Sequence, residues 1–190
     1  MNALEAIEKR RSCRSFKPDV LTRTQIEDIL QAGILAPSGK NAQPWEFIIL
    51  EDTARTTLSQ MMLSGVEDVK AQGIHPGSAE NSARIIGEAP VTVLVYNPLR
   101  KPEDAIGYDR YWLLVHTQSV GAAIQNMLLR AEEMGLGSLW ICDVWVAEPG
   151  LSEWLQREDE LVAAVTFGYP AESPPARPRK PLDKITTWHR

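Results

Sequence analysis

A rigid polar loop at residues 36–45, with the sequence Ala-Pro-Ser-Gly-Lys-Asn-Ala-Gln-Pro-Trp, separates a helical pattern from a strand pattern. Pro37 and Pro44 fix φ and lack a backbone donor, and Gly39 permits a positive φ, so no helix or strand can run through it. Its serine, asparagine and glutamine side chains suit a flat, hydrogen-bonding ligand. A helix stop followed by a polar turn explains the same residues, and both interpretations stay open on this stretch alone.

Hydrophobic periodicity predicts helices and strands on both sides of this loop. Helical spacing predicts helices over residues 2–11, 24–37, 53–65, 81–89 and 110–134, and a short helix that begins at residues 148–149. Runs rich in apolar and β-branched residues predict strands over residues 45–50, 91–96, 139–142 and 161–168. A chain of 190 residues with these elements suits a single domain, 1–190.

Two parts of the pattern stand out. Residues 66–81 are the least regular, because Gly73, Pro76 and Gly77 interrupt them, and we expect a mobile excursion or lid there. The predicted helix 110–134 is apolar around nearly its whole circumference, which is typical of a helix buried on all sides. That helix lies either between the sheet and a partner subunit or in the core of a monomer.

Two basic clusters lie far apart in the sequence. The first, Arg10-Arg11-Ser12-Cys13-Arg14, follows the first predicted helix and either complements the helix dipole or binds an anion, for which phosphate fits best. The second, at residues 177–180, lies in a proline-rich tail, 171–190, that cannot form a helix. Such a tail is either disordered or an arm lying on another surface, and its cations are a second candidate anion contact.

Several classes of function are disfavoured by composition. A net charge of −5 does not favour a nucleic-acid partner, and no apolar run is long enough to predict a membrane span. Cys13 and Cys142 have no zinc-ligand spacing and are interpreted as reduced thiols of a cytoplasmic protein. His75, His116 and His189 are too scattered to predict a metal site.

Four separate pieces of the chain, in this order, resemble the nitroreductase-like FMN-dependent oxidoreductase family. The pieces are residues 10–16 (Arg-Arg-Ser-Cys-Arg-Ser-Phe), the loop 36–45, residues 121–126 with 135–141 (Gly-Leu-Gly-Ser-Leu-Trp-Ile), and Gly168-Tyr169-Pro170 with residues 177–181 (Arg-Pro-Arg-Lys-Pro). Any one piece is weak evidence, whereas all four in order are specific and span nearly the whole chain.

The resemblance implies an α+β fold with a central mixed β-sheet flanked by helices. It implies an intertwined homodimer with an extended C-terminal arm, and FMN bound at the dimer interface. It also implies NADH or NADPH as electron donor. An all-round apolar helix and an extended arm, both read from the residues alone, agree with such a dimer.

The resemblance also implies which residues contact the flavin. The expected cofactor-binding residues are Arg10, Arg11, Ser12, Arg14, Pro37, Ser38, Gly39, Asn41, Ile141, Cys142, Asp143, Arg177, Arg179 and Lys180. Arg10, Ser12 and Arg14 are implied to hold the phosphate, ribityl chain and pyrimidine edge. Arg179, with Arg177 or Lys180, is implied to complete the phosphate site, and Pro37, Ser38, Gly39 and Asn41 to contact the flavin from the other subunit. Residues 141–143 are implied to lie near flavin N5, although many members have glycine where this chain has Cys142 and Asp143.

By this resemblance the chemistry belongs to the flavin, so no protein catalytic residue is expected beyond Arg14 as an electrostatic stabiliser. The implied activity is hydride transfer from NAD(P)H through flavin N5 to a nitroaromatic, quinone or similar small-molecule acceptor, in a ping-pong cycle. Two alternatives stay open. One is a specialised member of the same family, acting in dehalogenation, flavin fragmentation or a biosynthetic redox step, and the other is a non-catalytic FMN-binding dimer.

Overall fold

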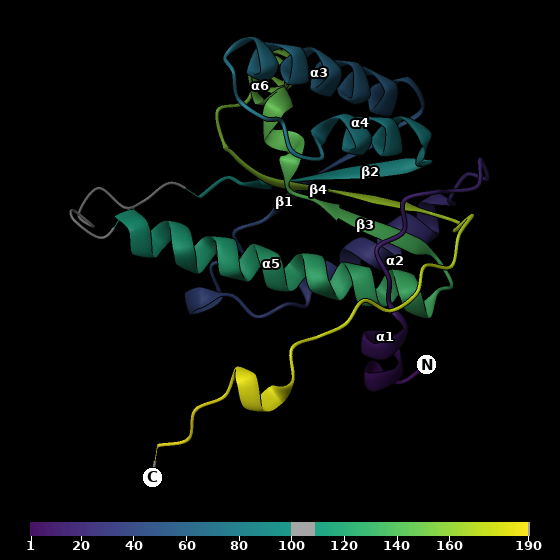
Figure 1. Ribbon diagram of the computed structural model, residues 1–190, viewed down its shortest axis with the longest axis vertical. Helices are drawn as coiled ribbons and strands as arrows, with labels where there is room; N and C mark the ends of the chain where they lie inside the picture. The colour runs from purple at the N-terminus through teal and green to yellow at the C-terminus, as the bar shows by residue number, and fades with distance from the viewer. Residues whose placement is uncertain (100–108, 190) are drawn as a thin grey trace.

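The computed structural model describes residues 1–99 and 109–189, which form a four-stranded sheet with helices on both faces (Figure 1). The α-helices are α1 (Ala3–Lys9), α2 (Arg23–Ile34), α3 (Asp52–Ala71), α4 (Ala79–Glu88), α5 (Asp109–Glu133) and α6 (Glu148–Leu155). The strands are β1 (Glu46–Glu51), β2 (Val91–Asn97), β3 (Gly137–Ile141) and β4 (Glu160–Gly168). Short 3₁₀ turns are η1 (Gly39–Asn41), η2 (Asp143–Ala147) and η3 (Leu182–Lys184).

The sheet has the strand order β1-β2-β4-β3, and each neighbouring pair is antiparallel. The α+β class is confirmed, but the mixed sheet is not what the four strands form. β2 and β3 do run in the same direction, joined by α5 as parallel strands require. Because β4 lies between them, no two neighbouring strands are parallel. Within the described residues, the parallel pairing is the isolated bridge between Ser12 and Ser138.

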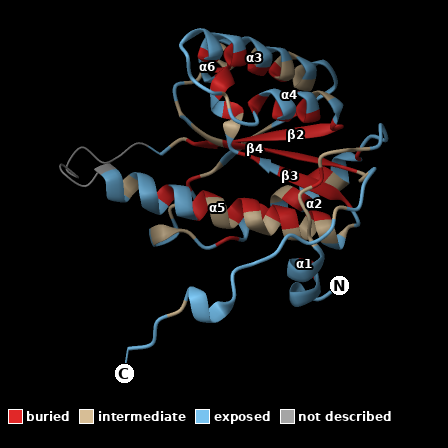
Figure 2. Cartoon of the chain, viewed as in Figure 1, coloured by how far each residue is buried: buried red, intermediate tan, exposed pale blue. Residues whose placement is uncertain are grey.

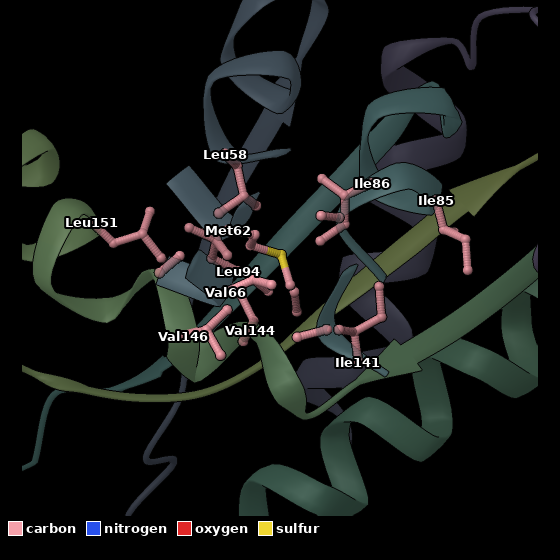
Figure 3. Packing of buried hydrophobic residues seen from close by; sticks show 14 of the residues in the cluster. Leu58, Met62, Val66, Ile85, Ile86, Leu94, Ile141, Val144, Val146 and Leu151 are labelled. Carbon is pink, nitrogen blue, oxygen red and sulfur yellow. The ribbon is translucent and has the colours of Figure 1, made fainter. Parts of the chain in front are cut away.

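Two hydrophobic clusters cover the two faces of the sheet (Figure 2). On one face, residues of α3, α4, η2 and α6 pack together, including Leu58, Met62, Ile86 and Leu151 (Figure 3). On the other face, α2 and α5 cover the sheet. Every residue of β2 is buried, which confirms the prediction of a central strand.

The helix predicted to be buried on all sides is buried over only part of its length. Towards its C-terminal end α5 contributes Ile124 and Met127 to the core, and both are fully buried. Its N-terminal part instead exposes large apolar side chains, at Tyr111, Leu113, Leu114 and Val115. The sequence pattern was correct, but the single chain supplies a covering surface for one part of the helix only.

The predicted excursion at residues 66–81 is shorter than expected. α3 continues to Ala71 because Val66 and Val69 extend the buried stripe of the helix into the hydrophobic core. α4 begins at Ala79, two residues before its predicted start. The segment between the helices is therefore residues 72–78, and its mobility stays a prediction.

The C-terminal arm leaves the body of the protein after Pro170 and is extended, apart from η3 (Figure 1). Its large apolar side chains, Leu182, Ile185 and Trp188, are mostly exposed. Within the described residues, no helix is long and apolar enough to cross a membrane.

Helix α3 approaches η2 so closely that only glycine fits at position 65. A Cβ there would overlap the carbonyl oxygen of Val146. We predict that Gly65→Ala destabilises the fold by about 3 kcal/mol, because a backbone carbonyl must move. Thermal unfolding should show a midpoint lower by about 6–12 °C.

Gly150→Ala is the matched control, since a Cβ there meets Met61 at an ordinary 3.5 Å. Its melting temperature should be unchanged or slightly higher, because alanine is the better helix former. Equal melting temperatures for the two variants would contradict the close packing of α3 on η2.

Candidate functional site

The two basic clusters meet in one cavity of about 410 Å³, called here the arginine cavity. Its lining residues are Ile7, Glu8, Arg10, Arg11, Ser12, Arg14, Pro174, Pro175, Ala176, Arg177 and Arg179. The sequence separates the two clusters by more than 160 residues, so the fold brings together cations that local structure could not. Of the predicted phosphate contacts, Lys180 is not among the residues that line this cavity.

Backbone pairing places the two segments side by side. Residues 10–16 leave α1 in an extended conformation, and the Cys13 amide donates to the carbonyl of Ser138 in β3 over 2.9 Å. The Ala171 amide at the start of the arm donates to the carbonyl of Ser15, also over 2.9 Å. The N-terminal segment is therefore held between β3 and the C-terminal arm.

Hydrogen bonds to the backbone orient several of the guanidinium groups. Arg11 Nη1 donates to the carbonyls of Glu8 (2.6 Å) and Arg10 (2.8 Å), which turns it back towards α1. Arg14 Nη1 donates to the Ser12 carbonyl over 3.1 Å, and Arg179 Nη1 to the Arg177 carbonyl over 3.2 Å. These carbonyls leave other guanidinium N–H groups available to a ligand.

The arginine cavity is strongly cationic in a protein whose net charge is −5. Five arginines line it, Glu8 is the one acidic residue among the lining residues, and no described carboxylate forms a salt bridge with those arginines. Guanidinium groups bind phosphate oxygens in a bidentate manner. The cavity therefore has the donor set of a phosphate site.

A carboxylate that the sequence analysis did not identify sits beside this cavity. Glu172 accepts a hydrogen bond from the backbone amide of Arg14 through Oε1, at 2.5 Å. The contact joins residues 158 positions apart, and no local spacing signals it. Its effect is to fix the backbone of Arg14 against the first residues of the arm.

The polar loop at residues 36–45 does not contribute to the arginine cavity. Residues 37–41 pack against the N-terminal half of α5, where the Gly39 amide donates to Ser119 Oγ over 3.2 Å. A Cβ at position 39 would overlap the side chain of Val115, so glycine is needed for close approach, whereas the expected positive φ is not found there. None of Pro37, Ser38, Gly39 and Asn41 lines the arginine cavity.

The segment predicted to lie near flavin N5 follows the end of β3. Ile141 is buried, Cys142 is exposed, and Asp143 begins η2. Asp143 Oδ2 accepts a hydrogen bond from Ser78 Oγ over 2.5 Å, which links this segment to residues 72–78. Asp143 Oδ1 is buried and has no partner among the described residues. These three residues also lie outside the lining of the arginine cavity.

Neither cysteine is activated. Partial loss of hydration raises the pKa of the Cys142 thiol although the residue is exposed, and the neighbouring Asp143 carboxylate raises that pKa further. Burial also raises the pKa of Cys13, whose Sγ donates to the Ser15 carbonyl over 3.1 Å. A raised pKa keeps both sulfurs as thiols at neutral pH, which disfavours nucleophilic chemistry. Among the described residues, no cluster of three or more His, Cys, Asp or Glu could hold a metal ion.

Comparison with known proteins identifies the family to which this chain belongs. The family model described as the nitroreductase family matches residues 7–169, and the chain belongs to that family. A Methanothermobacter thermautotrophicus protein, provisionally named NADH dehydrogenase/NAD(P)H nitroreductase, is 29% identical, covering 97% of this chain and 86% of that protein. The iodotyrosine deiodinase of Thermotoga neapolitana is 28% identical, covering 90% of each chain.

Among solved structures, a provisionally named nitroreductase from Desulfovibrio desulfuricans, in complex with FMN, superposes with a TM-score of 0.77. It is 25% identical, and the match covers 100% of this chain and 98% of that one. The family resemblance carried by the four sequence motifs is thus confirmed.

Proposed function

We propose that this protein is an FMN-dependent oxidoreductase that takes electrons from NADH or NADPH and passes them to a small aromatic or quinone-like acceptor. The observation that carries the proposal is the arginine cavity, in which Arg10, Arg14 and Arg179 meet although the sequence separates them. Membership of the nitroreductase family and the FMN-bound neighbour support the choice of cofactor.

The residues present fit FMN. Its terminal phosphate is doubly charged near neutral pH, and five arginines around one cavity supply the positive charge and the N–H donors that it needs. Ser12 adds a hydroxyl at the same cavity. When bound, the isoalloxazine ring supplies hydride transfer at N5, with reduction and reoxidation alternating in a ping-pong cycle.

The contribution of the chain is binding and electrostatics. We assign to Arg14 the role of stabilising the negative charge of reduced flavin, since the Ser12 carbonyl and Glu172 hold that residue in place. By the same family pattern, the segment Ile141–Asp143 would supply backbone groups near the ring. Both assignments follow the family pattern at matching positions.

A second subunit completes the proposed site. Within one chain, none of residues 37–41 lines the arginine cavity, and the loop lies against α5 instead, which favours a site that a second copy completes. The exposed apolar side chains Leu113 and Leu114 of α5, and Trp188 of the arm, supply surface for a homodimer. We propose that the loop 37–41 of each subunit contacts the flavin held by the arginines of its partner.

A second candidate reaction is reductive dehalogenation. The iodotyrosine deiodinase of Thermotoga neapolitana is a relative that matches this chain over 90% of its length, and its name assigns it the removal of a halogen. Both candidates need a reducible flavin and differ in the acceptor. A panel of nitroaromatics, quinones and halophenols, assayed with each nicotinamide, separates them.

The absorption spectrum is the direct test of the proposed function. We expect the purified protein to be yellow, or to become so with added FMN, and to bleach under anaerobic conditions when NADH or NADPH is added. Failure to bind FMN would contradict the proposal. A yellow protein that neither nicotinamide bleaches would instead support the non-catalytic FMN-binding dimer.

Removal of the arm tests the second subunit. A chain ending at Pro170 loses Arg177 and Arg179 together with the exposed apolar residues of the arm. We predict weaker FMN binding and a weaker dimer. Sedimentation velocity should show that the dimer dissociates at a higher protein concentration than the native dimer does. A chain ending after Pro181 is the control for the apolar residues, because it keeps both arginines. A chain ending at Pro170 that stays dimeric and yellow would contradict the wrapping arm.

A further inference from the structure

The loop at residues 38–43 holds its backbone in an unfavourable conformation. Five non-glycine residues in the described chain have a positive φ, and three of them, Lys40 (53°), Asn41 (56°) and Gln43 (50°), lie here. Positive φ is costly for residues with a Cβ, and glycine would remove the cost. A loop that served only as a turn would have no need of a lysine at position 40, so the side chain itself has a use.

The lysine side chain is held over an aromatic ring. Lys40 Nζ lies 5.6 Å from the centroid of the half-buried Trp112 ring, within cation–π range. The ring of His116, one turn further along α5, packs edge-on against Trp112 with centroids 5.5 Å apart. His116 is buried and Lys40 is exposed. The Trp112 ring therefore packs on a buried side chain, and the Lys40 ammonium lies on the side of the ring that faces solvent.

Two contacts of Gly39 hold the loop against α5 close to Trp112, and hydrogen bonds within the helix and within the loop support them. Gly39 packs against Val115 without room for a Cβ, and its amide donates to Ser119 Oγ. Ser119 Oγ in turn donates to the Val115 carbonyl over 2.7 Å. At the other end of the loop, the Gln43 amide donates to Ser38 Oγ over 3.0 Å. The arrangement is preorganised, because loop and helix hold it from both sides.

We propose that Lys40 and Trp112 form a specificity element for aromatic acceptors that carry an anionic group, such as a carboxylate. The ammonium attracts the anion, and the indole ring contacts the aromatic part of the acceptor. The inference rests on the proposed function, because it places the acceptor beside the loop 37–41 that contacts the flavin. In a chain with net charge −5, a local cation is what an anionic acceptor needs.

The test compares matched ligands that differ in charge. Benzoate and benzamide, which cannot be reduced, are titrated calorimetrically into the protein as purified. We expect the native protein to bind benzoate about three- to tenfold more tightly than benzamide, as a partly exposed ion pair allows. The same ratio should appear in kcat/KM for 4-nitrobenzoate over 4-nitrobenzamide, and it should shrink at high salt.

Five variants separate the effect of the charge from an effect on folding. Lys40→Met should abolish the preference, whereas Lys40→Arg should keep it. Trp112→Leu should weaken the binding of both ligands, because the indole ring contacts the aromatic part that they share. Lys17→Met removes an exposed lysine that lies outside the described sites and should leave the preference unchanged. Lys40→Gly should also abolish the preference while melting at or above the native temperature, because it relieves the positive φ.

Two results would overturn the proposal. One is an unchanged benzoate-to-benzamide ratio in Lys40→Met. The other is that Lys40→Met changes only the preference of the protein for NADPH over NADH. That result would assign the Lys40 ammonium to the 2′-phosphate of the electron donor. Calorimetry reports the charge preference whether or not the protein binds FMN, so a failure of the proposed function remains a separate outcome.

Discussion

The pairing of residues 10–16 with β3 and with the start of the arm is the interaction on which the candidate site depends. Two backbone hydrogen bonds, Cys13 to Ser138 and Ala171 to Ser15, bring the N-terminal and C-terminal segments together. Without them the arginines of the two clusters would be independent surface charges, each of little energetic consequence. With them, five guanidinium groups share one cavity, and their mutual repulsion is relieved when an anion binds.

The rest of the fold presents that cavity and leaves apolar surface uncovered. The sheet and the two clusters that sandwich it bury every residue of β2 and residues 163–168 of β4. The exposed apolar side chains gather on the N-terminal part of α5 and along the arm, with Leu4 and Ile7 of α1 also largely exposed. This distribution agrees with the proposed second subunit and with the proposal that residues 37–41 contact a flavin held by the partner.

The sequence predicted the features that depend on periodicity and residue type. Each α-helix and each strand was predicted. The sequence also identified the arginines, although only the resemblance to a family placed them in one site. Predictions failed where distant contacts decide the outcome. The extension of α3 through Val66 and Val69 depends on a core that no local pattern reveals, as do the contacts Arg14–Glu172 and Ser78–Asp143. The strain at Lys40 is visible only in the backbone angles.

Calorimetric titration of the flavin-free protein with FMN and with riboflavin tests the central claim most directly, because the two ligands differ by the phosphate alone. The account predicts that FMN binds at least about 100-fold more tightly, since several charge-assisted hydrogen bonds are lost with riboflavin. Arg179→Ala should narrow that difference by about tenfold, whereas Lys180→Ala, outside the cavity lining, should leave it unchanged. Equal affinity of the native protein for FMN and riboflavin would contradict the assignment of the arginine cavity to the phosphate.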